Sequence, residues 1–184
     1  MRTLVPVIVA ALCLAGCSSG GGGSSAATNG PPTVSTLPTS GTVRYTDGRV
    51  YTVAPLGRTL HLDDIAVHVQ SVVWRRSVKV GFKPPGTKIF GLVTLSVTNA
   101  TRSRQQVGLT QIWLRDTAGN PILAAGSATV PKNLLETPIP PGATVTGTLV
   151  YPAPRRETGY LLVYRFADAK AIAKAKHVGL LKYG

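Results

Sequence analysis

Short runs of alternating apolar and polar residues fill the chain from Thr42 onward, and they restrict its possible folds more than any other feature. In the clearest run, from Ile89 to Thr98, every second residue is apolar or glycine, and hydroxyl side chains take the intervening positions of its second half: Thr94, Ser96 and Thr98. A period of two is typical of a strand with one buried face. No long stretch has the period of a helix. The pattern predicts an all-β domain, an antiparallel immunoglobulin-like β-sandwich of about seven or eight strands, with a small closed barrel as the alternative.

Two hairpins are predicted near the start of this region. Asp47-Gly48 lies between the runs 43–46 and 49–53 and suits a two-residue type I′ turn, because both central residues of that turn need a positive φ. In this hairpin Tyr45 and Tyr51 can form a cross-strand pair. A second hairpin joins the runs 59–63 and 65–70.

Alternation and turn residues predict the other strands. They cover 89–98, 107–114, 144–151, 160–166 and 178–181, with breaks at 99–104, 118–121 and 138–142. The stretch 169–176, rich in Ala and Lys, predicts one or two exposed helical turns. Trp74 and Trp113 are interpreted as core or sheet-edge residues rather than as a platform for sugars, and Asn99-Ala100-Thr101 as a turn rather than a glycosylation site.

The N-terminus has the features of an export signal. Arg2 precedes an apolar stretch, 4–14, that is too short at 1.5 Å per residue to span a hydrocarbon core of roughly 30 Å. The residues that close it, Leu14-Ala15-Gly16-Cys17, resemble the lipobox of bacterial prolipoproteins. This resemblance implies cleavage between Gly16 and Cys17 and a diacylglyceryl group, with palmitate as a typical acyl chain, on the Cys17 thiol. An ordinary secretory signal is the alternative, and Cys13 is interpreted as a discarded residue of the apolar stretch.

The predicted organisation has three parts: a lipoprotein signal peptide over 1–16, a lipidated Cys17 with a disordered tether over 17–41, and one β-sandwich domain over 42–184. The tether is rich in Gly, Ser, Thr and Pro and carries no charge. A chain of this kind spans roughly 27 Å end to end, more than the Debye length of about 8 Å. Both cysteines precede the domain, so no disulfide is available to it.

The chain is strongly basic, with 20 Lys and Arg against 7 Asp and Glu and a formal net charge of +13. Such a balance favours anionic neighbours such as lipid headgroups, wall polymers or acidic proteins. The cations are dispersed from Arg44 to Lys182, as they also are on solvated strand faces. Dispersal and export together argue against nucleic acid as a partner.

The sequence offers little to catalysis. It has no Gly-x-Ser-x-Gly or Ser-x-x-Lys motif and no cysteine after Cys17. A triad of Ser96, His68 and Asp63 can be imagined, but the spacing does not support it. His61, Asp63 and His68 form a possible metal site, because two share a strand parity and the third can lie across the hairpin; alternatively both histidines lie on the polar face of a half-buried sheet. We predict no enzymatic activity and no resident metal or cofactor.

Four stretches carry a resemblance to a known family: 57–60 leading into 65–69, 92–99, 113–116 with the turn at 119–120, and 139–145 leading into 147–151. Their order is similar to that of the exported immunoglobulin-like domains of actinobacteria and related bacteria grouped as DUF4352, or telokin-like, which are relatives of the mycobacterial secreted antigen family MPT63. The resemblance implies the fold and a lipoprotein context, and it brings no general activity. The high basicity and the Lys-rich stretch near the C-terminus depart from the family.

These observations predict a surface lipoprotein, held on the outer face of the cell membrane by Cys17, whose basic domain binds an envelope protein or an anionic polymer. The alternative is a small-molecule or metal carrier that uses His61, Asp63 and His68. A wall-active hydrolase is a third hypothesis, and the low content of acidic residues disfavours it.

Overall fold

The computed structural model describes residues 40–44, 48–135, 137–155, 161–164 and 177–182. The regular secondary structure of these residues consists of strands alone. In chain order they are β1 (Gly41–Arg44), β2 (Val50–Pro55), β3 (Thr59–Leu62), β4 (Ile65–Arg75), β5 (Ile89–Asn99), β6 (Gln105–Gln106), β7 (Ile112–Arg115), β8 (Pro121–Ile122), β9 (Pro138–Ile139), β10 (Thr144–Ala153), β11 (Leu161–Tyr164) and β12 (His177–Lys182). The predicted helical turns over 169–176 lie outside the described residues.

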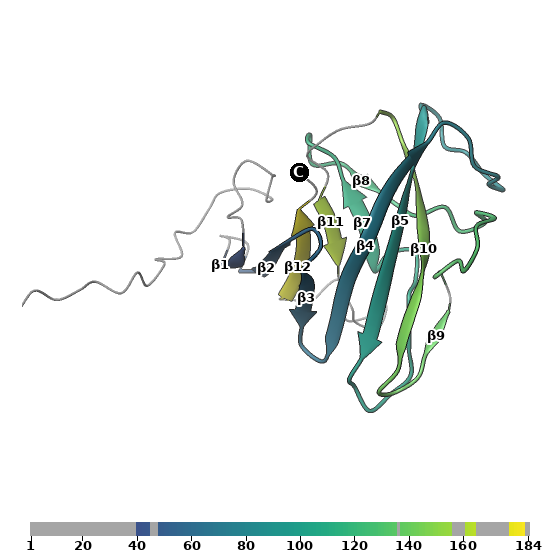
Figure 1. Cartoon of the computed structure of the whole chain (residues 1–184). Coiled ribbons are helices and arrows are strands. Elements are labelled where there is room, and N and C mark those ends of the chain that lie inside the picture. Colours follow the sequence, from purple (N-terminus) through teal and green to yellow (C-terminus); the bar gives the residue numbers. More distant parts are fainter. Residues whose placement is uncertain (1–39, 45–47, 136, 156–160, 165–176, 183–184) are drawn as a thin grey trace, which may run out of the picture.

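The strands form a β-sandwich (Figure 1). One layer is a six-stranded sheet in the order β1-β2-β12-β11-β7-β8, and the other is a four-stranded sheet in the order β10-β5-β4-β3, with β6 and β9 as a short additional pair. The predicted immunoglobulin-like sandwich is therefore confirmed. Two features differ from the prediction: β12 pairs with β2 in parallel, and the described residues form twelve strands, three of them only two residues long, where seven or eight were predicted.

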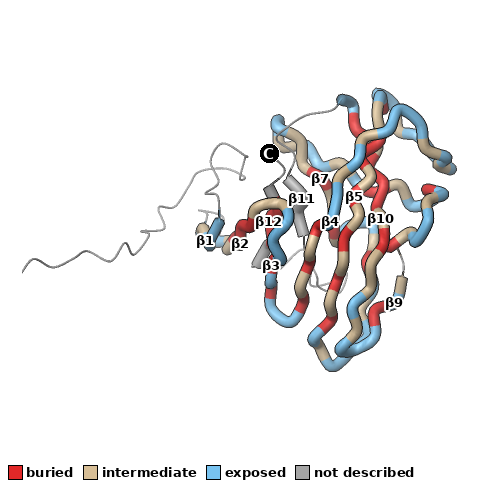
Figure 2. The backbone as a smooth tube through the Cα atoms, in the orientation of Figure 1, coloured by how far each residue is buried: buried red, intermediate tan, exposed pale blue. Residues whose placement is uncertain are grey.

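The core fills the space between the two layers. Its buried side chains come from the inner faces of both sheets, and they include Leu60, Val67, Val93, Leu95, Val97, Leu149, Ile112, Leu114 and Leu181. The tube in Figure 2 shows buried positions recurring between less buried ones along β4, β5 and β10. Trp74, as predicted, packs against this core, and its ring lies 3.0 Å from the position that a Cβ on Gly91 would take.

The outer face of the β5–β10 pair changes character along its length. Three successive pairs of opposite residues join their hydroxyls across the strands: Thr94 with Thr148 at 3.1 Å, Ser96 with Thr146 at 2.8 Å, and Thr98 with Thr144 at 2.8 Å. The next two pairs are apolar, Leu92 with Val150 and Phe90 with Pro152. The predicted polar face of this strand is thus confirmed for one half, and the other half needs a cover.

Two loops supply that cover. Phe90 and Val150 are buried although they lie on the outer face, because Val78 and Val80 of one loop and Ala125, Ala128 and Val130 of another pack against them. This second cluster is separate from the main core. The loops that bury this cluster also line a pocket on the surface.

The first predicted hairpin exists with a different turn. Arg44 pairs with Val50, whereas a two-residue turn at Asp47-Gly48 would place Tyr45 opposite Val50. Tyr51 lies opposite Val43 and is buried, and Tyr45 lies outside the described residues. The predicted tyrosine pair thus involves a residue outside the described part of the chain and stays a prediction. The register therefore differs by one residue from the one that a two-residue turn at Asp47-Gly48 predicts.

The second predicted hairpin is confirmed. Leu62 pairs with Ile65, which leaves a two-residue turn at Asp63-Asp64, and Asp63 has a φ of 51°. Further along the chain, the predicted strand 107–114 is shorter than expected. Only Ile112–Arg115 forms β7, while Leu109 lies in the preceding turn with 40% of its surface exposed.

Asn99 organises the end of the sandwich at which β5 terminates. It is fully buried, and its Nδ2 donates to the carbonyl oxygens of Ser103 (2.8 Å) and Ile139 (2.9 Å). Its Oδ1 accepts from the backbone N–H and the hydroxyl of Thr101. The interpretation of 99–101 as a turn is confirmed, because the side chain that a sugar would modify is buried within that turn.

Tyr151 links the two layers. It is buried on β10, and its hydroxyl donates to the carbonyl oxygen of Ile112 on β7 at 3.2 Å. Burial raises the pKa of Tyr151 well above its ordinary value of 10.0, because the ionised ring would lose its hydration. No helix in the described part of the chain is long and apolar enough to cross a membrane.

Tyr151 makes the stability of the fold fall in alkali. Above pH 10 the unfolded tyrosine releases its proton while the folded one retains it, so the free energy of unfolding decreases as the pH rises, by up to about 1.4 kcal/mol per pH unit. Tyr151→Phe should lower the free energy of unfolding by about 1 kcal/mol at neutral pH, because it removes the hydrogen bond to Ile112. Between pH 10 and 11 the free energy of unfolding of this variant should fall less than that of the unmodified chain. Urea unfolding across this range measures both effects, and parallel pH profiles would contradict the assignment.

Candidate functional site

Cys17, predicted to carry the lipid, and Gly16, predicted to precede the cleavage, lie outside the described residues. Their roles in cleavage and attachment therefore stay predictions.

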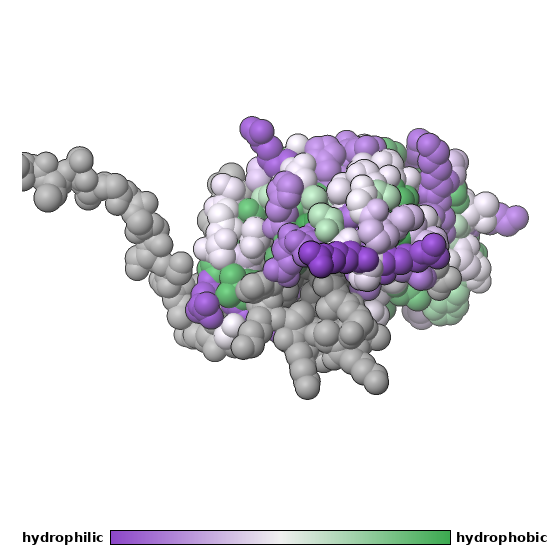
Figure 3. Space-filling view, turned by 90° about the horizontal axis from the view of Figure 1, so that it is seen from below, coloured by the Kyte–Doolittle hydropathy of each residue, from purple (hydrophilic) through white to green (hydrophobic). Residues whose placement is uncertain are grey.

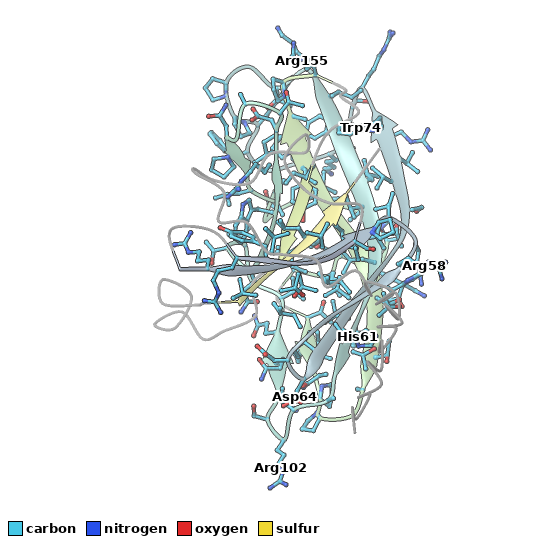
Figure 4. The ribbon with its side chains drawn as sticks, turned by 90° about the vertical axis from the view of Figure 1, so that its left-hand side faces the viewer. Arg58, His61, Asp64, Trp74, Arg102 and Arg155 are labelled. Carbon is cyan, nitrogen blue, oxygen red and sulfur yellow. The ribbon has the colours of Figure 1, made fainter. Side chains whose placement is uncertain are left out.

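The three predicted metal ligands do not converge. His61 on β3 and His68 on β4 both lie on the outer, polar face of the four-stranded sheet, as the alternative interpretation expected, and Asp63 lies in the exposed turn between these strands. Figure 4 shows His61 near the end of the sandwich that carries Asp64 and Arg102. Among the described residues no group of three His, Cys, Asp or Glu side chains is placed to hold a metal. The carrier hypothesis based on these residues thus has no geometric support.

The imagined triad is not assembled either. Ser96 lies opposite His68 in the β4–β5 ladder, but its hydroxyl accepts from Gln70 Nε2 at 2.9 Å and joins Thr146 Oγ1 at 2.8 Å. The Nδ1 of His68 lies 3.5 Å from Thr59 Oγ1. These contacts belong to the hydroxyl pairing of the outer face and indicate a structural role.

A pocket of about 410 Å³ opens beside the apolar half of the β5–β10 face. Among the described residues its lining consists of apolar side chains and backbone, with Ser127 as the one polar side chain: Phe82, Pro84, Leu109, Pro121, Ile122, Leu123, Ala124, Ala125, Gly126, Ser127 and Pro152. Three of these are large hydrophobic residues exposed to solvent, namely Phe82 (71%), Leu123 (48%) and Leu109 (40%). Exposed large apolar residues gathered around a concavity are typical of a binding surface.

The two loops that form the pocket are fastened to each other and to the sheet. The backbone N–H of Gly81 donates to Ser127 Oγ at 2.8 Å, and Thr129 N–H donates to the carbonyl oxygen of Lys79 at 2.9 Å. Ala125 N–H donates to the carbonyl oxygen of Val150 on β10 at 2.7 Å. A Cβ on Gly81 would collide with the Ser127 side chain, so the close approach of the loops requires glycine there.

Proline restricts the pocket walls further. Pro84, Pro121 and Pro152 line it, and each fixes its own φ near −65°. A cavity whose walls are held by hydrogen bonds and prolines loses little conformational entropy when a ligand enters. The geometry is therefore suited to binding an apolar group without a large rearrangement.

The loop that carries Phe82 is also the most one-sided segment in charge. Between β4 and β5 and their adjoining ends, residues 75–88 contain five cations and no acid: Arg75, Arg76, Lys79, Lys83 and Lys88. All five are exposed, and Lys83 stands between two lining residues. Along the sequence, the described acidic residue nearest to a lining residue is Asp116. Its carboxylate accepts hydrogen bonds from the backbone and the side chain of Asn120. The pocket thus combines an apolar floor with a cationic border.

Sequence reasoning missed this site. Leu109 was assigned to a strand, and the lining comes from four separate parts of the chain, which only the tertiary fold brings together. One local signal was present. Phe82 is an aromatic residue in a segment of glycine, proline and lysine, Gly81-Phe82-Lys83-Pro84-Pro85-Gly86, which suits neither a strand nor the core.

Several solved structures are similar to this chain. The yjhA protein of Bacillus subtilis matches with a TM-score of 0.53 and 17% identity, over 71% of this chain and 98% of its own. MPT63, a secreted protein of Mycobacterium tuberculosis, matches with a TM-score of 0.53 and 15% identity, over 71% and 95%. The ycdA protein of Bacillus subtilis, named as a candidate lipoprotein, matches with a TM-score of 0.52 and 12% identity, over 68% of this chain and 38% of its own. At these identities the likeness shows the fold.

A family model also matches the sequence. It is described as a domain of unknown function, DUF4352, and it covers residues 54–174. The match takes in every strand from β3 to β11 and all residues that line the pocket. A search among curated proteins found no match.

Proposed function

This chain belongs to the DUF4352 family, and on that premise we propose that it is an exported, lipid-anchored binding module, without enzymatic activity, whose pocket takes the apolar part of its ligand. The observation that carries the proposal is the pocket of about 410 Å³ with three exposed hydrophobic side chains on its lining. The volume lies within the range of roughly 300–1,000 Å³ that ligand pockets occupy. The cations of 75–88 favour a ligand that also carries negative charge.

The lining favours binding over catalysis. Ser127 is the one polar side chain among the lining residues that the structure describes, and its oxygen already accepts the N–H of Gly81. Nucleophilic catalysis needs a base within hydrogen-bond reach of the nucleophile, and the described residues of the lining include no His, Asp, Glu or Lys. A ligand is therefore held here by apolar contact and by charge at the border.

Export and anchoring rest on the N-terminus. The lipobox-like Leu14-Ala15-Gly16-Cys17 supports attachment of a diacylglyceryl group to Cys17. Two acyl chains hold a protein on a bilayer stably, whereas one gives only marginal binding. The appearance of a secreted protein and a candidate lipoprotein among the similar structures agrees with this context.

The anchor can be tested in cells grown with an alkyne-tagged palmitate. The unmodified chain should take up the label and stay in the membrane fraction, and Cys17→Ser should abolish labelling. Cys13→Ser is the matched control, since it removes the other cysteine and should leave labelling intact. Equal labelling of the Cys17 variant and the unmodified chain would show that the lipid is attached elsewhere.

The pocket can be tested with the fluorescent amphiphilic anion 1-anilinonaphthalene-8-sulfonate and the chain from Ser18 onward, which holds every described strand. Phe82→Ala and Leu123→Ala should each weaken binding by about ten-fold, because each removes roughly 1–2 kcal/mol of apolar contact. Val73→Ala is the control: Val73 is a large hydrophobic residue with 40% exposure that does not line the pocket. Fluorescence titration gives the dissociation constants, and equal weakening by all three variants would place the probe elsewhere.

A further inference from the structure

We infer that the pocket and the cationic segment 75–88 together form a face that docks on the anionic surface of the membrane to which the chain is anchored. This inference rests on the lipid anchor of the proposed function and names the partner of the same pocket. The partner is an anionic bilayer surface, recognised by charge at the border and by apolar contact at the centre.

Charge complementarity is the first argument. Five exposed cations, and no acid, occupy residues 75–88, and Lys79, Lys83 and Lys88 belong to the part of the loop that forms the pocket wall or adjoins it. A Lys or Arg near an anionic bilayer contributes about 1 kcal/mol of attraction. Several such residues on one segment therefore suffice for docking that depends on anionic lipid.

Apolar exposure at the same place is the second argument. Phe82 follows Gly81 and precedes Lys83, and with 71% exposure it is the most exposed of the large hydrophobic residues in the described part of the chain. Leu109 and Leu123 expose further apolar surface on the pocket lining. Aromatic and aliphatic side chains bordered by Lys and Arg are the composition that proteins use at the bilayer interface. Figure 1 shows the loop between β4 and β5 projecting from one end of the sandwich, where such contact is sterically open.

The opposite end lacks this combination. Asp63 and Asp64 form its β3–β4 turn, and Arg102 and Arg104 follow β5 there, so acids and cations are mixed. Figure 3 views the molecule from this end and shows hydrophilic side chains extending across its middle. In Figure 4, Asp64 and Arg102 mark this end, while Trp74 and Arg155 lie toward the other. The molecule therefore has one end suited to an anionic, apolar surface and one suited to water.

The connection to the anchor is long enough for either end to reach the membrane. About 23 residues separate Cys17 from Gly41, and at roughly 3.4 Å per residue they span up to about 78 Å. A compact domain of the length of residues 42–184 has a radius of gyration of about 14 Å and hence a diameter of about 40 Å. The tether does not select an orientation, so the surface chemistry of the domain decides which end meets the bilayer.

The test uses the full lipoprotein reconstituted in vesicles of phosphatidylcholine alone or of equal parts phosphatidylcholine and phosphatidylglycerol. The mature chain has no thiol except the acylated Cys17, so Pro85→Cys provides a single site for an environment-sensitive fluorophore beside Phe82. Its emission should shift to the blue in the anionic vesicles and return in high salt. The matched label at Arg102→Cys, at the opposite end, should not shift.

Variants assign the effect to the face. Replacing Lys79, Lys83 and Lys88 by Ala should lower the docked-to-free ratio by about a hundred-fold, from about five-fold per cation. The paired replacement Arg102→Ala with Arg104→Ala should leave it unchanged. Equal shifts at both labels, equal shifts in both vesicles, or a response only to monomeric lysophosphatidylglycerol would overturn the docking inference. Failure of the protein to remain with neutral vesicles would instead overturn the lipid anchor, so the two failures are distinguishable.

Discussion

The register between β5 and β10 is the constraint on which the rest of the surface depends. Because Ser96 faces Thr146, the outer face of this pair carries hydroxyl pairs along one half and apolar pairs along the other. The hydroxyl pairs can be solvated, whereas exposure of Phe90 and Val150 to water is unfavourable. Two loops therefore cover Phe90 and Val150. A shift of one residue would turn every side chain of one strand to the opposite face and remove both the core and this division.

The pocket is a consequence of that cover. The loops before β5 and after β8 are tied by the Gly81–Ser127 hydrogen bond and bury the apolar half of the face, but they leave Phe82 and Leu123 exposed at their margin. Cations concentrate on the first of these loops. The half of the β5–β10 face that carries the hydroxyl pairs and the turn at Asp63-Asp64 lie toward the opposite end of the sandwich (Figure 4). The fold therefore separates an amphiphilic end from a hydrophilic one.

Local periodicity was enough to predict the sandwich, the parity of 89–98 and 144–151, and the hairpin at Asp63-Asp64, because each depends on neighbours in sequence. Local periodicity did not predict features that depend on contacts between residues far apart in the sequence. The register of the first hairpin departs from the one that its Asp-Gly dipeptide predicts, and the parallel pairing of β12 with β2 joins the two ends of the domain. The pocket was beyond reach for the same reason, since Leu109, Leu123 and Pro152 meet only in the folded chain. The predicted histidine site shows the converse: His61, Asp63 and His68 are near in sequence, but among the described residues no three such side chains are placed to hold a metal.

The central claim is that the end of the sandwich that carries Phe82 meets anionic lipid in the cell. The most direct measurement places the photoreactive residue benzoylphenylalanine at position 82 of the full lipoprotein in living cells, irradiates them, and determines the mass of the adduct. Docking of this end predicts an added mass equal to that of an anionic membrane lipid, with no such adduct when the same residue replaces Arg102 at the opposite end. Adducts at position 82 that consist only of protein would contradict it.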